Sequence, residues 1–388
     1  IRISGNCNGE RSGGNKMKRA SGVLMPVFSL PSKYGIGCFS KEAYKFVDQL
    51  KKAGQSYWQI LPLGPTGYGD SPYQSFSTYA GNPYFIDLKT LVKEGLLTKK
   101  ECKKVRCKEQ KKIDYEKIYQ NRFKILKKAY RRFQKNDKYE KFLEENAFWL
   151  EDYCMYMAIK DAHEGKSWSE WEELLKKREK TALEKVKEEL EDEIGFYQFQ
   201  QYEFDRQWKK LHTYAKEQGI QIIGDIPIYV AFDSADAWAA PELFQFDEEN
   251  NPIRVAGCPP DAFAKTGQLW GNPLYNWEYH QKTGYAWWIQ RIRYCFQRYD
   301  VVRIDHFRGF DEYYAIPYGE STAENGTWMP GPGMKLFQAI EKELGRPEII
   351  AEDLGFLTES VLQMLKESGF PGMKVLQFAF DPSGESVY

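Results

Sequence analysis

An alternation of amphipathic helical segments with short apolar runs is the feature that most constrains the fold of this chain. The first helical segment begins after Ser40, a preferred N-cap residue, and ends at Gly54, a residue type that commonly stops helices. The same order, a helical segment and then an apolar run, recurs at four later places. With a first run near the start, six strands are predicted, at 23–28, 57–63, 220–229, 301–305, 349–352 and 373–380.

Apolar strands separated by helices predict a parallel sheet with helices outside it, as a barrel or as an open doubly wound sheet. An open nucleotide-binding sheet usually has a glycine-rich turn after its first strand, whereas here that strand leads into Ser-Leu-Pro-Ser at 29–32 and no GxGxxG or Walker pattern occurs. Acids at the ends of several strands match the way barrels build their sites. We therefore predict an α/β fold, a (β/α)8 TIM barrel with helical insertions.

Changes in residue composition along the chain suggest four segments. Residues 98–194 are dense in Lys and Glu, with apolar residues at helical spacing, which predicts a helical insertion subdomain with solvated charged faces. Residues 17–97 would form the start of the barrel, with strands 1 and 2, and residues 195–388 its continuation, with strands 3 to 6. Residues 1–16 are poor in apolar side chains, which favours a disordered tail or a non-native extension.

Charge and cysteine content exclude several classes of function. The chain has 55 Lys and Arg against 55 Asp and Glu, so no global field attracts nucleic acid or anionic lipid. Its seven cysteines are scattered and lack a CxxC pair, which argues against a disulfide framework or a zinc site and favours a reducing compartment. No stretch approaches the roughly 20 apolar residues that span a bilayer. We expect a cytoplasmic protein that binds neither nucleic acid nor membranes; the sequence does not indicate an oligomeric state.

Carboxylates at the ends of the apolar runs are the first candidates for catalysis. One run ends in Asp305 and another in Glu352. Two strand ends that each deliver an acid suggest one site with two carboxylates, which is the equipment for cleaving a glycosidic bond. Asp225 closes a third run in the same way. Three acids at three strand ends favour catalysis over separate structural roles.

The neighbours of these acids suggest how each would act. Side chains alternate faces along a strand, so Arg303 and Asp305 point the same way and the guanidinium can keep the carboxylate ionised, as a nucleophile requires. A plain structural ion pair fits that spacing equally well. Glu352 follows an apolar run, where desolvation would raise its pKa and suit a general acid/base, while Asp353 is the better candidate for an acid at the N-terminus of the following helix. His306 can donate to a sugar hydroxyl or simply be packed.

Loops rich in aromatic, glycine and amide residues accompany these acids. They lie at 69–74, 81–84, 257–263 and 267–273. Aromatic rings offer apolar platforms for the C–H faces of sugars, and Asp, Asn and Gln side chains bind hydroxyls. Each loop taken singly is more often a turn, but together they suit an oligosaccharide.

Six longer motifs occur in order along the chain: GVLMPVFSLPSKYGIG, LPLGPTGYGDSPYQSFSTYAGNPY, GDIPIYVAFDSADAW, PPDAFAKTGQLWGNPLY, VRIDHFRGF and IAEDLG. In these motifs the chain closely resembles the 4-alpha-glucanotransferases (amylomaltase, or disproportionating enzyme) of glycoside hydrolase family 77, which are related to the alpha-amylase clan. The resemblance extends from about Arg19 to Pro382.

The resemblance implies a retaining double displacement on alpha-1,4-glucans, with no metal and no organic cofactor. Asp305 falls at the position of the family's nucleophile and Glu352 at that of its general acid/base. The other residues at matching positions would orient the nucleophile or bind sugar: Arg303, His306, Asp225, Tyr73, Asp70 and Ser71. The stretch 257–270 resembles a flexible loop over the cleft, whose contacts to glucan would be Phe263, Gln268 and Trp270. Such a lid favours the 4-hydroxyl of another glucan over water as the acceptor.

The chain departs from the family at its C-terminal end. Family members continue into a seventh strand that ends in a Thr-His-Asp motif with a third essential carboxylate, and no residue after Phe380 matches it. We therefore expect a truncated chain, with about six of eight barrel strands. The leading prediction is a 4-alpha-glucanotransferase acting on maltooligosaccharides and amylose. The alternatives are an alpha-amylase-like or alpha-glucosidase-like hydrolase, and a non-catalytic glucan-binding fragment.

Overall fold

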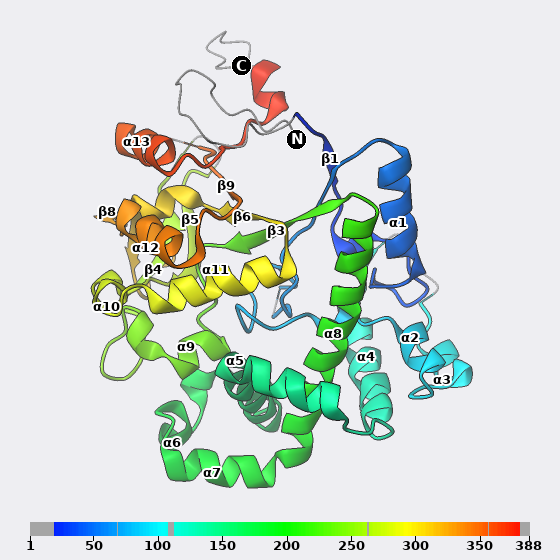
Figure 1. Cartoon of the computed structure of the whole chain (residues 1–388). Coiled ribbons are helices and arrows are strands. Elements are labelled where there is room, and N and C mark those ends of the chain that lie inside the picture. Colours follow the sequence, from blue (N-terminus) through cyan, green and yellow to red (C-terminus); the bar gives the residue numbers. More distant parts are fainter. Residues whose placement is uncertain (1–18, 68, 108–111, 262–263, 356, 381–388) are drawn as a thin grey trace.

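A parallel sheet lies at the centre of the protein, with helices packed along its outer face (Figure 1). The computed structural model describes residues 19–67, 69–107, 112–261, 264–355 and 357–380. Within these residues the sheet has five strands in the order β1-β2-β3-β6-β9. They are β1 (Gly22–Leu24), β2 (Tyr57–Gln59), β3 (Gln221–Pro227), β6 (Val301–Asp305) and β9 (Ile349–Ala351). The sequence therefore predicted five parallel strands correctly, with bounds somewhat too wide for most of them.

The helices between these strands place the sheet in the arrangement of a (β/α)8 barrel, whose hydrogen-bonded ring is open between β1 and β9 in the described residues. The connecting helices are α1 (Lys41–Lys52), α8 (Glu191–Glu217), α11 (Ala286–Arg298) and α12 (Met334–Leu344). The prediction for α1 is confirmed: Ser40 Oγ accepts a hydrogen bond from the backbone N of Glu42 at 3.3 Å, and Ala43, Val47 and Leu50 are buried. No helix in the described part of the chain is long and apolar enough to cross a membrane.

The sixth predicted strand, at 373–380, is wrong. After α13 (Glu359–Ser368) the chain approaches β9, and the backbone N of Ala351 donates to the carbonyl of Pro371 at 2.9 Å. The ladder stops there because the N–H of Met373 donates instead to the side chain of Asp353, at 2.6 Å. The following residues form a short 3₁₀ helix, η6 (Leu376–Phe380).

A second sheet, which the sequence did not predict, packs beside the first. It is antiparallel in the order β5-β4-β7-β8, formed by β4 (Arg254–Cys258), β5 (Gln268–Pro273), β7 (Glu312–Pro317) and β8 (Thr327–Pro330). The bounds expected for the flexible loop, 257–270, are too wide, because both of its ends belong to paired strands. That the segment between β4 and β5 covers the cleft stays a prediction. The backbones meet closely at Gly257, where a Cβ atom would lie 2.2 Å from the carbonyl oxygen of Gln268.

The segment 98–194 is helical, as its spacing indicates, and where a separate subdomain would begin and end stays a prediction. Its helices are α3 (Lys99–Lys104), α4 (Tyr115–Tyr130), α5 (Asp137–Ala162), η3 (Trp168–Glu170), α6 (Glu173–Lys176) and α7 (Lys180–Glu189), and α8 continues from there to the start of β3. The other short helices are η1 (Val27–Ser29), η2 (Pro83–Phe85), α2 (Leu88–Lys93), α9 (Ala235–Ala239), η4 (Pro241–Leu243), α10 (Trp277–Lys282) and η5 (Phe307–Phe310).

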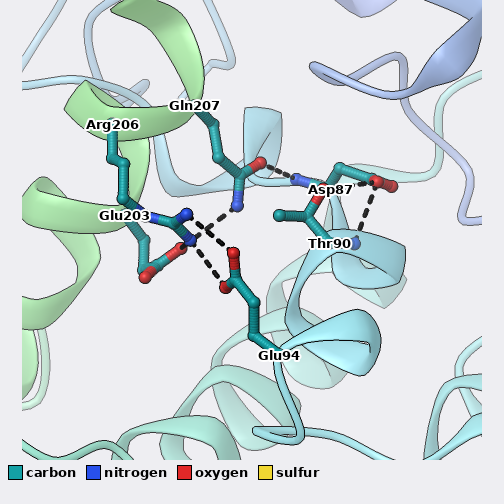
Figure 2. A network of polar contacts seen from close by, with 6 residues as sticks. All are labelled: Asp87, Thr90, Glu94, Glu203, Arg206 and Gln207. Atoms are coloured by element: carbon teal, nitrogen blue, oxygen red, sulfur yellow. Dashed lines mark hydrogen bonds and ion pairs between the residues drawn. The ribbon is translucent and has the colours of Figure 1, made fainter. Parts of the chain in front are cut away.

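A polar network fixes α2 against the middle of α8 (Figure 2). Arg206 of α8 makes two hydrogen bonds of 2.7 Å to Glu94, just after α2, and a third of 2.6 Å to Glu203. The next residue of α8, Gln207, accepts a hydrogen bond from the backbone N of Asp87, the N-cap of α2, at 2.8 Å. The side chain of Glu203 is only 2% exposed, so its charge depends on Arg206 for compensation.

Candidate active site

The strand register brings the predicted site residues onto the inner face of the parallel sheet. Asp225 of β3 lies opposite Arg303 of β6, and Pro227 lies opposite Asp305. Glu352 extends β9 by one residue, and its backbone N–H donates to a carbonyl of β6 at 3.0 Å. Side chains alternate faces along a strand, so four side chains point inward at the carboxyl ends of their strands. They are Asp225, Arg303, Asp305 and Glu352.

Arg303 joins two of the acids. Its Nη1 lies 2.7 Å from Asp225 Oδ1 and its Nη2 lies 2.8 Å from Asp305 Oδ1. The side chain of Asp225 is 1% exposed and that of Asp305 is 34% exposed, so one partner is an internal anchor and the other faces accessible space. The expected Arg303–Asp305 ion pair is therefore present. Arg303 also pairs with Asp225, so its guanidinium bridges the two carboxylates.

Glu352 is held by two backbone N–H groups. Its Oε2 accepts from the N of His306 at 2.8 Å and its Oε1 from the N of Leu354 at 2.9 Å. Burial raises the pKa of Glu352, and the Asp305 carboxylate raises it further, while the two N–H groups and Arg303 oppose the rise. This environment is the desolvated one that the sequence predicted, and it suits a carboxyl group that holds a proton for donation.

Tyr73 supports Asp225 from the loop that follows β2. Its hydroxyl donates to Asp225 Oδ2 at 2.7 Å. Burial raises the pKa of Asp225 to about 6, and both the Arg303 guanidinium and the Tyr73 hydroxyl oppose the rise. Asp225 is thus ionised at neutral pH and becomes protonated in mild acid. Ser71 shapes the turn, because its Oγ accepts from the backbone N of Tyr73 at 3.3 Å.

His306 follows Asp305 in a left-handed conformation, with φ of 54°. Burial, and then the nearby Arg308 charge, lower the pKa of His306 to about 4, so its imidazole is neutral at pH 7. Its buried Nε2 has no hydrogen-bond partner among the described residues. The Trp270 ring meets the imidazole edge to face, with centroids 4.8 Å apart, and also approaches Tyr229 at 6.3 Å. The small sheet therefore contributes directly to the site through β5.

Two other predicted residues do not join this cluster, and a third lies where the structure describes nothing. Asp70 is exposed and lines a separate cavity of about 1100 Å³, whose described walls include no member of the carboxylate group. Gln268 is exposed on β5, where its Oε1 accepts from Trp270 Nε1 at 3.1 Å. Phe263 lies outside the described residues.

The sequence missed two residues beside the cluster. Met373 places its sulfur 3.2 Å from Arg303 Nε, and Asp353 binds the backbone N of Met373. Asp353 was assigned to the start of the following helix, but that role belongs to Thr358, whose side chain accepts from the N of Val361. No periodic pattern in the sequence links Asp353 or Met373 to Arg303. Their contacts depend on the path by which the chain comes back to the parallel sheet after α13.

A parallel α/β barrel with one ion-paired acid and one acid of raised pKa at neighbouring strand ends is typical of enzymes that cleave glycosidic bonds. Comparison with known proteins narrows the class. The model of glycoside hydrolase family 77, described as 4-alpha-glucanotransferase, matches residues 25–388. The chain therefore belongs to the 4-alpha-glucanotransferase family.

Individual relatives agree with this assignment. A 4-alpha-glucanotransferase of Clostridium butyricum is 51% identical over 368 residues, which cover 94% of this chain and 76% of that protein. One from Streptococcus pneumoniae is 52% identical over 375 residues, covering 95% of this chain and 74% of that protein. The solved amylomaltase from Streptococcus agalactiae in complex with acarbose superimposes with a TM-score of 0.93 at 44% identity, over 95% of this chain and 76% of that one.

Proposed function

We propose that this protein transfers segments of alpha-1,4-glucans between maltooligosaccharides by a retaining double displacement. The observation that carries the proposal is the pairing of Arg303 with Asp305 beside a partly buried Glu352 whose pKa is raised. A carboxylate kept ionised and a carboxyl group that retains its proton are the two groups that this mechanism requires. The family assignment and the likeness to an amylomaltase solved with acarbose support an alpha-glucan as the substrate.

In the first step, a carboxylate oxygen of Asp305 attacks the anomeric carbon and forms a glycosyl ester. The glycosidic oxygen leaves as the bond breaks and takes the proton of Glu352. In the second step, the 4-hydroxyl of an acceptor glucan gives its proton to the Glu352 carboxylate and attacks the same carbon, which releases Asp305. The neutral His306 would bind a hydroxyl of the sugar at the cleaved bond through its Nε2. The ionised Asp225, whose two oxygens are bound by Arg303 and Tyr73, would act on that sugar through these two side chains.

Incubation with maltotriose tests the reaction. A transferase yields glucose and longer oligomers while the number of reducing ends stays constant, and Asp305→Asn abolishes both products. Glu352→Gln would lose transfer from maltotriose but retain ester formation from a maltosyl fluoride, because fluoride leaves without acid assistance. A rising number of reducing ends would show a hydrolase instead. Binding of maltooligosaccharides without turnover would show a glucan-binding protein.

We also propose that the protein acts in the cytoplasm. The free thiols of the described cysteines, including the buried Cys38 and Cys154, favour a reducing compartment. Cell fractionation with an antibody to the protein tests this, and recovery from the culture medium or an oxidising compartment would contradict it.

A further inference from the structure

Arg303 uses all three of its nitrogen positions. Its two Nη atoms bind Asp225 and Asp305, and its Nε lies 3.2 Å from the sulfur of Met373. A guanidinium is planar, so fixing Nε together with both Nη atoms fixes the orientation of the whole plane. The position of the Asp305 carboxylate therefore depends on what holds Nε as well as on Asp225.

The contact at Nε is made by an unusual acceptor. A thioether is a weak, neutral acceptor, and it satisfies the Nε–H without adding negative charge. A third carboxylate at this place would compete with Asp225 and Asp305 for the guanidinium charge. The Met373 sulfur instead leaves the charge of Arg303 to the two acids that it bridges.

Met373 is itself held in place. Its backbone N donates to Asp353 Oδ1 at 2.6 Å, and its side chain packs against the layer of Ile223, Val301 and Ile350 below the carboxylates. The preceding Gly372 lies so close to Asp353 that a Cβ atom there would be 2.3 Å from Oδ2. The geometry of 372–373 is thus built around the Asp353 carboxylate.

We propose that Met373 and Asp353 are positioning residues for the proposed reaction: Asp353 holds Met373, and the Met373 sulfur fixes Arg303 and, through it, Asp305 and Asp225. This inference rests on the proposed function. It assigns to the segment after α13 a role in holding the carboxylate of Asp305, the proposed nucleophile, in position. Neither residue touches the reacting atoms.

Replacing Met373 tests the role of the sulfur. Met373→Leu keeps the apolar volume and removes the acceptor, whereas Met373→Gln supplies a carbonyl oxygen at a similar distance from the backbone. We expect Met373→Leu to lower kcat for maltotriose about tenfold, in line with the loss of one hydrogen bond to a charged group, with KM little changed. Met373→Gln should recover most of kcat. Met364→Leu, which replaces a buried methionine of α13, is the matched control and should keep wild-type kinetics and thermal stability.

A pH profile separates positioning from general destabilisation. Arg303 lowers the pKa of Asp225, so a loosened Arg303 lets that pKa rise above about 6. The acid limb of the kcat profile should therefore move to higher pH in Met373→Leu, while its melting temperature stays close to that of Met364→Leu. Asp353→Ala should show the same displacement, and Asp353→Asn, which retains an oxygen acceptor for the Met373 N–H, should show little of it.

A spectroscopic measurement makes the test independent of activity. In protein labelled with ¹⁵N-arginine, the Nε–H signal of Arg303, assigned with Arg303→Lys, should be protected from exchange in the wild type and in Met373→Gln but not in Met373→Leu. Equal protection in all three, or a kcat and pH profile in Met373→Leu that match the wild type, would overturn the inference. If the wild type transfers no glucan, the proposed function fails, and the exchange data alone then decide whether Met373 holds Arg303.

Discussion

At the scale of single residues, the charge balance of the site depends on Arg303. One guanidinium binds two of the three acids, and burial disfavours the ionised form of both Asp225 and Glu352. Asp225 stays ionised at neutral pH because Arg303 and Tyr73 both bind it directly. Glu352 has no such direct cationic partner, and its pKa is raised by burial and by the nearby Asp305 carboxylate.

The Tyr73 hydroxyl gives a residue-scale prediction. Its hydrogen bond lowers the pKa of Asp225, which burial raises to about 6. In Tyr73→Phe this pKa should rise by about half a unit to one unit, as expected for the loss of one hydrogen bond of about 1 kcal/mol. Activity depends on the ionised Asp225 that anchors Arg303, so it should fall at a higher pH on the acid side than in the wild type. The kcat/KM profile for maltotriose between pH 4 and pH 8 measures the displacement.

Tyr318→Phe is the control for this prediction, because Tyr318 is 55% exposed and lies just after β7. Its profile should coincide with that of the wild type. An acid limb in Tyr73→Phe that is unchanged or moves to lower pH would show that Tyr73 does not set the ionisation of Asp225.

The residues of this cluster that follow a regular spacing could be predicted from the sequence, whereas contacts between separate segments could not. Alternation along one strand is enough to place Arg303 and Asp305 on one face, and the apolar run before Glu352 indicates its desolvation. The bridge to Asp225 depends on the register between β3 and β6, which the sequence of either strand leaves open. The Met373 contact depends on a chain return that breaks strand pairing, so no periodic pattern marks it.

At the scale of elements, the parallel strands were predictable and the antiparallel ones were not. Strands buried on both faces are continuous apolar runs, as in Val301–Asp305 and Ile349–Ala351. The strands of the small sheet contain glycine, proline and polar residues, as in Gln268–Pro273, and so resemble loops. β4 and β8 pair with β7, a strand of apolar and aromatic residues, and β5 pairs with β4. This pairing supplies the order that the sequences of β4, β5 and β8 do not indicate.

The network between α2 and α8 gives an element-scale prediction (Figure 2). Arg206→Ala leaves Glu203 buried without its cationic partner, so the free energy of unfolding at pH 7 should fall by about 3 kcal/mol. Burial raises the pKa of Glu203 and Arg206 opposes the rise, so in the variant this pKa lies further above its unfolded value. The loss of stability is therefore full above the raised pKa and diminishes as the pH falls through it. Urea unfolding at pH 7 and at pH 5 measures both effects.

Lys209→Ala provides the comparison on the same helix. Lys209 pairs with Asp205 at 2.8 Å, but its side chain is 56% exposed, so its removal should cost less than about 1 kcal/mol at either pH. Equal stability of Arg206→Ala and Lys209→Ala at pH 7 would contradict the prediction, as would a deficit in Arg206→Ala that grows toward pH 5.

At the scale of the whole molecule, the site lies where the two sheets meet. The parallel sheet supplies Asp225, Asp305 and Glu352 from the ends of its strands, and the small sheet supplies Trp270 from β5. The two are joined in sequence, since β7 begins one residue after η5, the 3₁₀ helix that follows β6. Any movement of the small sheet therefore acts on the surroundings of His306, through the contact of its imidazole with the Trp270 ring.

This arrangement predicts that Trp270 controls the fate of the glycosyl ester. The ring packs against His306, next to Asp305, so we expect it to shield the side of the cluster that faces the small sheet from water. In Trp270→Ala, water should reach the ester more easily, so the ratio of hydrolysis to transfer should rise severalfold while the total turnover of maltotriose falls. Counting new reducing ends against oligomers longer than maltotriose gives the ratio. Leu269→Ala changes the adjacent residue on the opposite face of β5, which is 38% exposed, and should leave the ratio unchanged. A ratio in Trp270→Ala equal to that in Leu269→Ala would mean that shielding of the ester does not depend on the small sheet, and that the acceptor itself must exclude water when it binds.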